Sequence, residues 1–243
     1  MPACIAAAAN RFWIAFALAL CASFTCRGVS AADEAADGKR TLPLIFEETF
    51  EAGADKWEPT DSEAWKIVDG RDGKGYSLFK ASKYKPPQRS PLNYSLRKDA
   101  NVTDFVLEAD VQSKARDYGH RDMCLFFGFQ DPAHFYYAHV ARTTDDHANQ
   151  IFIVDGAERQ KISTKTTPGT MWDDNWHHLQ LVRDVKSGEI AVYFDDMQSP
   201  VMTATDKTFA WGRVGLGSFD DVGIWDNVKL RGATADKSPA SQK

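Results

Sequence analysis

The chain is poor in cysteine, and its four cysteines are unevenly placed. Cys4, Cys21 and Cys26 lie near the N-terminus, and Cys124 is the remaining one. Since a single cysteine cannot pair within its own chain, the region beyond residue 26 cannot be held together by a disulfide framework. Cys124 stands inside the apolar run MCLFF at 123–127, which predicts a small buried thiol rather than a reactive nucleophile.

Long apolar runs are also missing, apart from one near the N-terminus at 12–24. This run is shorter than the roughly 20 residues of a membrane-spanning helix. Arg11 precedes it and the small residues VSAA at 29–32 follow it, an order typical of a secretory signal peptide. We expect residues 1–32 to be cleaved and the protein to be secreted, in the periplasm or outside the cell, with no membrane span. Acylation of a cysteine in this segment, as in a lipoprotein, is the alternative.

A helical period is equally absent, because no stretch keeps apolar residues at helical spacing over three turns. Short alternations of apolar and polar residues recur instead, separated by Gly, Pro, Asp and Asn. In residues 105–111 (FVLEADV), for example, the odd-numbered positions are apolar and fall on one face of a strand. The expected strands are 44–51, 64–69, 76–81, 105–111, 123–130, 134–142, 150–155, 176–183, 188–196, 200–204, 212–218 and 222–230. This pattern predicts an all-β sandwich or barrel rather than a parallel α/β sheet.

The domain boundaries follow from composition. A polar stretch at 33–41 is expected to be a linker, and the Ala-, Ser- and Lys-rich stretch at 233–243 is expected to be a disordered tail. Residues 42–232 remain as one domain, which is long enough to bury a substantial core.

Two stretches of sequence resemble laminin-G and concanavalin A-like lectin/glucanase domains. Residues 176–183 (WHHLQLVR) and 188–196 (GEIAVYFDD) resemble the laminin-G hairpin. Residues 212–219 (GRVGLGSF) and 225–228 (WDNV) are similar to the last two strands of concanavalin A-like domains. The start of the domain, at residues 46–57 and 65–70 (WKIVDG), is similar to the opening of secreted bacterial sugar-active domains, including the keto-disaccharide hydrolase-like group. The resemblance implies a two-sheet antiparallel jelly-roll sandwich, a fold that hosts lectins, glycanases and adhesion modules alike.

The segment 116–150 is unusually rich in histidine, acids, amides and aromatic residues. Its strands are apolar on both faces, so the outer face is either covered by loops or forms a concave platform of aromatic rings. Such a platform, with polar groups around it, suits sugar rings and their hydroxyl groups. Alternation places His134 with Tyr136 on one face and Tyr137 with His139 on the other. The expected ligand-binding residues are Arg121, Asp122, Tyr136, Tyr137, His139, Asp146, His147, Asn149 and Gln150.

The leading hypothesis is therefore a secreted, non-catalytic carbohydrate-binding module that recognises extracellular glycans. An enzyme that hydrolyses or eliminates at a sugar is the second hypothesis, with His120, Asp122, His134 or His139 as the acid or base. An adhesion module that binds protein is the third. Glu108 and Asp110 begin the E-x-D-x-x-E pattern of retaining glycanases of this fold, but Ser113 replaces the last acid, so we interpret them as polar residues on the outer face.

Charge and spacing limit the cofactors and partners. The net charge of -5 argues against nucleic acid or an anionic membrane as the partner. A zinc site is disfavoured because the sequence has no His-Glu-x-x-His motif and no paired cysteines. A structural calcium ion, as the family implies for the first and last strands, would use Glu48 and Asp226. No other cofactor is expected.

Overall fold

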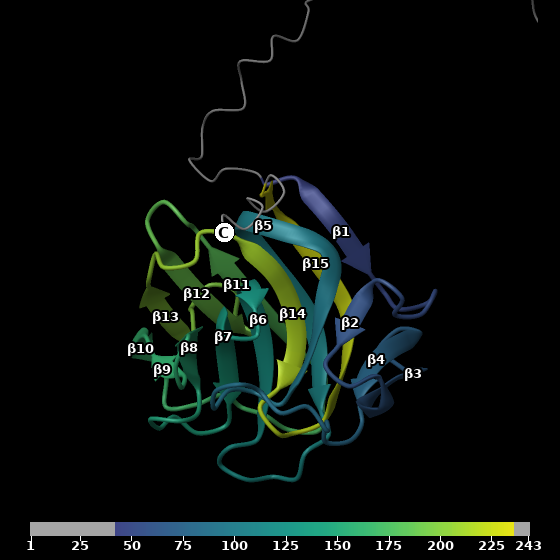
Figure 1. Ribbon diagram of the computed structural model, residues 1–243. Coiled ribbons are helices and arrows are strands. Elements are labelled where there is room, and N and C mark those ends of the chain that lie inside the picture. Colours follow the sequence, from purple (N-terminus) through teal and green to yellow (C-terminus); the bar gives the residue numbers. More distant parts are fainter. Residues whose placement is uncertain (1–41, 236–243) are drawn as a thin grey trace, which may run out of the picture. The chain divides into compact units, whose positions relative to one another are not determined.

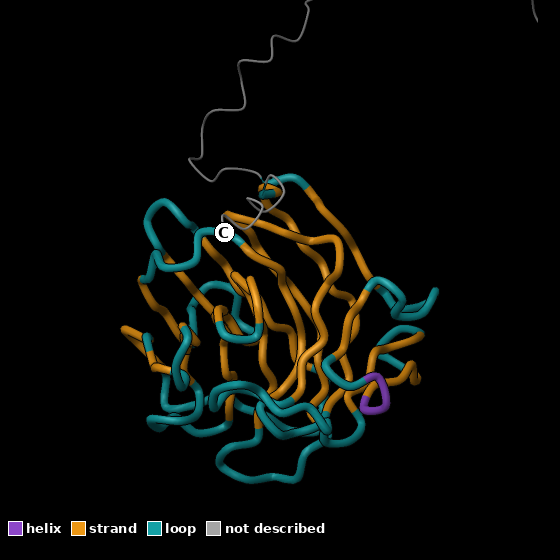
Figure 2. Tube along the Cα trace, in the orientation of Figure 1, coloured by secondary structure: helices purple, strands orange, loops and turns teal. Residues whose placement is uncertain are grey.

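The computed structural model describes residues 42–235, and almost all of this region is strand or loop (Figure 2). Within it, the helical element is one short 3-10 turn, η1 (Ser62–Ala64), and no helix is long and apolar enough to cross a membrane. The all-β class predicted from the sequence is confirmed. The expected signal peptide and linker lie outside the described residues, as does the tail beyond residue 235.

The strands form two antiparallel layers that share one long strand, β5 (Figure 1). We call the first the aromatic layer; its order is β2 (Trp57–Pro59), β5 (Asn93–Ser113), β14 (Gly212–Ser218), β6 (Asp122–Asp131), β7 (His134–Ala141), β8 (Gln150–Asp155) and β9 (Gln160–Lys161). We call the second the polar layer; it contains β3 (Trp65–Asp69), β4 (Lys74–Leu78), β15 (Gly223–Thr234), β1 (Leu44–Glu48), β5, β11 (His177–Arg183), β12 (Glu189–Phe194), β13 (Met202–Thr205) and β10 (Ser163–Thr166).

Strand β5 belongs to both layers because its two halves have different neighbours. Residues 93–102 pair with β14 in the aromatic layer. Residues 102–113 pair with β11 on one side and β15 on the other, in the polar layer. The sequence predicted only the second half as a strand, since the polar run RKDANVTD at 97–104 hides the continuation. The strand therefore turns a corner of the sandwich where the sequence suggested a loop.

The polar layer has one apolar and one polar face, as its alternating sequence predicts. Leu179 and Leu181 of β11 and Leu107 and Ala109 of β5 are fully buried in the central core. The intervening residues face outward, and this face carries charged and amide side chains. Phe194 of β12 also points into the core. An antiparallel sheet that is packed on one side and solvated on the other shows this alternation.

The aromatic layer is buried on both faces. Met123, Leu125 and Phe127 of β6 point into the central core, whereas Cys124 and Phe126 join a second buried cluster on the outer face. The other members of this second cluster are Tyr94, Leu96, Phe129, Phe135, Tyr137, Phe152 and Val154. The sequence left open whether this face is covered by loops or forms a bare platform, and the structure shows that it is covered.

A loop at 80–92, which we call the strap, contributes to this cover. Tyr84 packs edge-on against Tyr94, with ring centroids 5.6 Å apart and hydroxyl oxygens 3.2 Å apart. Farther along, the carbonyl oxygen of Arg89 accepts a hydrogen bond from the backbone N–H of Arg159. The strap is thus tied both to β5 and to the loop that follows β8.

The C-terminal boundary of the domain differs slightly from the expected one. Strand β15 runs to Thr234, which pairs with Val102, and the N–H of Ala235 donates to the carbonyl of Asn101 over 3.0 Å. The tail was expected to begin at residue 233, which is wrong for residues 233–235 because β5 provides their hydrogen-bond partners.

Candidate functional site

The two tyrosines expected to form a sugar platform are both completely buried. Tyr136 points into the central core, where its hydroxyl donates to Asp206 and accepts from the N–H of Phe209. Tyr137 points to the outer face, where its hydroxyl accepts from Nη1 of Arg159 over 2.8 Å. The opposite orientation of these neighbours is confirmed. Neither ring, however, offers a free face for stacking on a ligand. The central core surrounds Tyr136, and Phe126 and Phe152 pack against Tyr137.

Three of the polar residues expected to bind ligand serve the fold. The Arg121 guanidinium is buried and donates to Ser113 and to the carbonyl of Asp173, so it joins β5 to a distant loop. Asn149 has a positive φ of 52° and uses its side-chain oxygen to accept from Ala141. Gln150 donates to the carbonyl of Asp145. These side chains hold the loops at one end of the aromatic layer.

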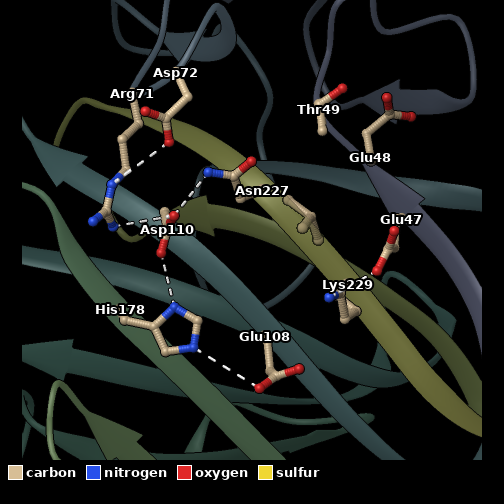
Figure 3. A pocket seen from close by; sticks show the side chains of 11 residues that line it. Glu47, Glu48, Thr49, Arg71, Asp72, Glu108, Asp110, His178, Asn227 and Lys229 are labelled. Atoms are coloured by element: carbon tan, nitrogen blue, oxygen red, sulfur yellow. Dashed lines mark hydrogen bonds and ion pairs between the residues drawn. The ribbon is translucent and has the colours of Figure 1, made fainter. Parts of the chain in front are cut away.

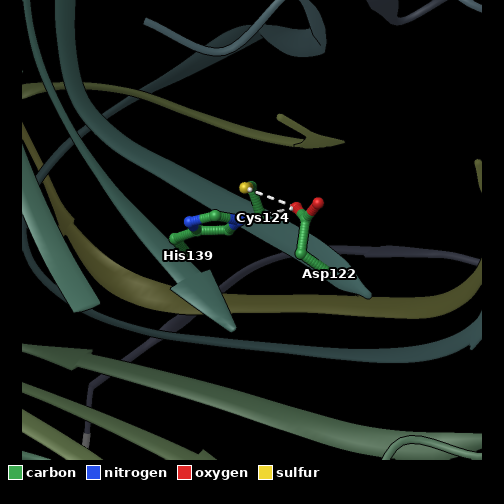
Figure 4. Close-up of side chains that lie close together, drawn as sticks. All are labelled: Asp122, Cys124 and His139. Atoms are coloured by element: carbon green, nitrogen blue, oxygen red, sulfur yellow. Dashed lines mark hydrogen bonds and ion pairs between the residues drawn. The ribbon is translucent and has the colours of Figure 1, made fainter. Parts of the chain in front are cut away.

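Asp122 and His139 meet on the outer face of the aromatic layer, next to Cys124 (Figure 4). The carboxylate Oδ2 of Asp122 lies 3.3 Å from Nε2 of His139 and 3.3 Å from Sγ of Cys124. It also accepts hydrogen bonds from the Ser218 hydroxyl and the N–H of Phe219. All three members of the cluster are buried.

A cavity of about 200 Å³ opens beside this cluster, and we call it the His139 cavity. Its aromatic lining is Tyr118 and Phe219, and its charged or titratable lining is Arg89, His120, His139, His147, Arg159 and Asp220. The Phe219 ring stacks on the His139 ring, with ring centroids 5.9 Å apart. The Arg159 guanidinium lies 4.3 Å from the centre of the Phe219 ring. The cavity therefore combines half-buried rings with hydrogen-bond donors and acceptors.

The half-buried Asp221 and the exposed Asp220 give this region an unusual electrostatic character. Burial, reinforced by the charge of Asp122, raises the pKa of Asp221 to about 6. The same two causes raise the pKa of Asp220. Tyr118 donates to Asp221 over 2.9 Å, and burial followed by this hydrogen bond raises the pKa of the phenol. Acids whose pKa approaches neutrality mark candidate functional sites.

The structure separates the other predicted residues from this cavity or places them at its rim. His120 is exposed at the rim and contacts Asp145 over 2.6 Å. His134 lies at the opposite end of β7, beside Asp131. Asp146 is exposed and paired with Lys161. Of the four catalytic candidates, His120 and His139 line the cavity and Asp122 lies behind it, whereas His134 belongs elsewhere.

Glu48 and Asp226, the expected calcium ligands, are engaged by other groups. Glu48 is paired with the buried Arg97 over 2.8 Å and also accepts from the N–H of Phe50. Asp226 accepts from the backbone N–H groups of Arg71 and Asn227. Burial raises the pKa of Asp226. Both carboxylates are thus held by an arginine or by backbone N–H groups, as is typical of carboxylates that stabilise a fold.

A second and larger cleft, of about 470 Å³, lies on the outer face of the polar layer (Figure 3). His178 of β11 contacts Asp110 over 2.8 Å, and its other ring nitrogen is 3.9 Å from Glu108. The hydrogen bond to Asp110 raises the pKa of His178. Burial acts to raise the pKa of Asp110, but hydrogen bonds from His178 and Asn227 lower it overall. The outward orientation predicted for Glu108 and Asp110 is confirmed, whereas the role of His178 was missed.

Several residues of the His139 cavity were also missed. Phe219 and Asp220 read as a turn after the GLGS strand, and Arg89 and Arg159 lie in polar loops without a motif. The adjacent acids Asp220 and Asp221 were the one sequence feature that could have indicated the cavity, because a turn needs at most one such carboxylate.

The comparisons with known proteins establish the fold. No family model matches the sequence, and no curated protein sequence is significantly similar to it. Among solved structures, a carbohydrate-binding module, CBM66, from Bacillus subtilis is 21% identical, with a TM-score of 0.51 over 72% of this chain and 95% of that chain. The winged bean acidic lectin, complexed with methyl-α-D-galactose, is 12% identical, with a TM-score of 0.50 over 79% and 98%.

A proposed glycosyl hydrolase from Parabacteroides distasonis is 15% identical, with a TM-score of 0.50 over 77% of this chain and 99% of that chain. A lectin, a carbohydrate-binding module and this protein thus share one architecture, although their sequence identities are low. The concanavalin A-like resemblance is confirmed at the level of the fold. The chain has the all-β, antiparallel, concanavalin A-like lectin/glucanase fold.

Proposed function

We propose that the protein is an exported carbohydrate-binding module and that its ligand site is the His139 cavity. The observation that carries this proposal is the lining of the cavity, where the half-buried ring of Phe219 lies among Arg159, His139 and Asp220. The His139 cavity takes the place of the wider platform of Tyr136 and Tyr137 that the sequence suggested.

The lining matches the two kinds of surface that a sugar presents. The apolar face of a sugar ring packs against an aromatic ring, and its hydroxyl groups both donate and accept hydrogen bonds. Phe219 and Tyr118 supply rings, Arg89 and Arg159 supply donors, and Asp220 supplies an acceptor. The cavity, at about 200 Å³, is smaller than the roughly 300–1,000 Å³ of sites for drug-sized ligands. It therefore suits one sugar unit, such as a chain end or branch, rather than a long stretch of polymer.

The structural neighbours support this proposal at the level of the fold, because they include a carbohydrate-binding module and a lectin. Export, which the N-terminal sequence predicts, would bring the domain to extracellular glycans. The alternative of an adhesion module that binds protein predicts a flat, apolar face. The cavity is instead hollowed and lined by charged side chains, which does not favour that alternative.

A glycan array on the purified protein tests the proposal. We expect at least one glycan to bind, and Phe219→Ala to weaken that binding by about five- to thirtyfold, since removing a stacked ring costs about 1–2 kcal/mol. Phe79→Ala is the matched control, because this exposed ring lies outside the cavity and contacts Lys66. Equal affinity of the two variants for the glycan, or no binding to any glycan, would contradict the proposal.

The second candidate is an enzyme that cleaves at a sugar, and the convergence of titratable groups favours it. His120, His139 and Asp220 line the same cavity, and Asp221 behind it has a pKa raised to about 6. A group that titrates near neutral pH can act as general acid or base. Incubation of the array ligands with the protein, followed by product analysis, separates the two. If the protein is an enzyme, the ligand is converted to product, and His120→Gln removes this turnover while binding remains. If the ligand is recovered unchanged, the protein is a binding module.

A further inference from the structure

Asp122, Cys124 and His139 form a buried cluster of side chains that could bind a metal ion. The three residues come together because Asp122 and Cys124 lie two apart on one face of β6, and His139 is the partner of Cys124 on β7. Each directs one ligand atom inward, and these atoms all lie within 4.8 Å of one another. Thiol, imidazole and carboxylate are the ligand types that zinc takes in proteins.

His139 is oriented so that Nε2 points into the cluster. Its other ring nitrogen, Nδ1, lies 2.9 Å from the backbone carbonyl of His147. A carbonyl only accepts hydrogen bonds, so Nδ1 carries a proton and the neutral ring has its lone pair on Nε2. That atom is buried and makes no hydrogen bond. A lone pair held 3.3 Å from the carboxylate of Asp122 is repelled unless a metal ion or a proton lies between the two atoms.

Two of the three distances in the cluster match the edges of a tetrahedral zinc site. With zinc bonds of about 2.0 Å to oxygen and nitrogen and about 2.3 Å to sulfur, the ligand atoms are separated by about 3.3 Å for oxygen and nitrogen and about 3.5 Å for oxygen and sulfur. Both observed separations from Oδ2 of Asp122 are 3.3 Å. The third edge, between Nε2 of His139 and Sγ of Cys124, is within 4.8 Å, and binding would set it at about 3.5 Å.

The partners around the cluster resemble those that orient metal ligands. The carbonyl of His147 fixes the ring of His139. The Ser218 hydroxyl and the N–H of Phe219 hold the carboxylate of Asp122. Hydrogen bonds of this kind fix the ligand geometry of metal sites and raise the basicity of the imidazole.

We propose that Asp122, Cys124 and His139 form a zinc site behind the His139 cavity. On binding, the Cys124 thiol releases its proton to solvent and the thiolate, the imidazole Nε2 and the carboxylate each donate a lone pair to the ion. Three protein ligands leave one position of the tetrahedron for water, as in zinc sites that remain open. His139 lines the cavity, which gives the ion a route from solvent. The site does not depend on whether the cavity binds sugar.

Cobalt substitution and direct zinc titration test the proposal on the purified protein after treatment with a chelator. We expect one zinc ion per chain by calorimetry and elemental analysis. Cobalt(II) should give the charge-transfer absorption of a thiolate ligand. Nitrogen NMR should show Nε2 of His139 unprotonated and shifted by zinc. Cys124→Ala should remove the cobalt absorption and weaken zinc binding roughly 100-fold or more, since even the outer partners of metal ligands are worth 10- to 100-fold.

His134→Gln is the matched control, because His134 is on the same strand but pairs with Asp131 outside the cluster. It should leave zinc affinity unchanged. Absence of zinc binding, equal binding by Cys124→Ala and the wild type, or a cobalt spectrum without thiolate absorption would each overturn the site. If Nε2 of His139 carries a proton and its NMR shift does not change on addition of zinc, the ring is an imidazolium paired with Asp122 and the zinc site is overturned. The cobalt spectrum and the nitrogen shifts of the wild type decide the matter even if the Cys124 variant does not fold.

Discussion

Replacing Tyr137 with alanine should destabilise the domain strongly, because its ring is a central member of the second buried cluster. The ring is completely buried and packs against Phe152 and Phe126, with centroids 5.1 and 5.9 Å away. Loss of a buried aromatic ring costs about 3–5 kcal/mol. For a domain of this size, each kcal/mol lowers the melting temperature by about 2–4 °C, so we expect a fall of roughly 6–20 °C.

Phenylalanine substitutions separate the ring from the hydroxyl group. Tyr137→Phe keeps the ring and frees Arg159, which is half-buried and can turn to water, so we expect a loss of about 1 kcal/mol in the free energy of unfolding. Tyr136→Phe leaves the buried N–H of Phe209 without its acceptor, and should cost more, about 1–3 kcal/mol. Urea denaturation, followed by tryptophan fluorescence, measures all three variants. A Tyr137→Ala protein within 1 kcal/mol of the wild type would refute the assignment of a packed outer face.

Three further changes probe other parts of the fold. Phe194→Ala removes a ring from the central core and should cost about 3–5 kcal/mol in denaturant unfolding; a neutral result would mean that β12 does not face inward. Arg97→Ala leaves the carboxylate of Glu48 without its buried partner and should cost about 3–5 kcal/mol by the same measurement. The hydrogen bond that His178 donates to Asp110 raises the pKa of His178 above 6.5. The contribution of this pair to stability is therefore complete below pH 6.5 and is lost as the pH rises through the raised pKa. His178→Gln should therefore be less stable than the wild type by about 0.5–1 kcal/mol near pH 6, and this difference should shrink as the pH rises through the raised pKa of His178.

The fold could be predicted because its strands carry their own pattern. The alternation in residues 105–111 and in the hairpin of 176–183 and 188–196 sets both the strands and their buried faces. The corner of β5 could not be predicted, since residues 97–104 are polar and their strand structure depends on hydrogen bonds to β14. Tertiary partners decided that segment, which local sequence does not show.

The site was harder to predict because it depends on register and on loops. Counting seven residues back from Asp131 and seven on from its partner His134 places Cys124 opposite Ala141. An irregularity in the pairing after Phe127 shifts Cys124 to His139 instead. A bulge of this kind re-aims side chains, and sequence alone does not locate it. The strap is likewise held at the aromatic face by a contact between residues distant in the sequence, the hydrogen bond from the N–H of Arg159 to the carbonyl of Arg89.

The most direct test of the account is a map of the bound glycan on the protein. Nitrogen–proton NMR spectra recorded during titration with the best array ligand locate the residues that contact it. We predict that the largest shifts fall on the loops of the His139 cavity, at His120, Arg159 and Phe219, and that His178 on the polar layer is unaffected. Shifts centred on Glu108 and His178, with Phe219 unchanged, would contradict the account and move the ligand site to the opposite face.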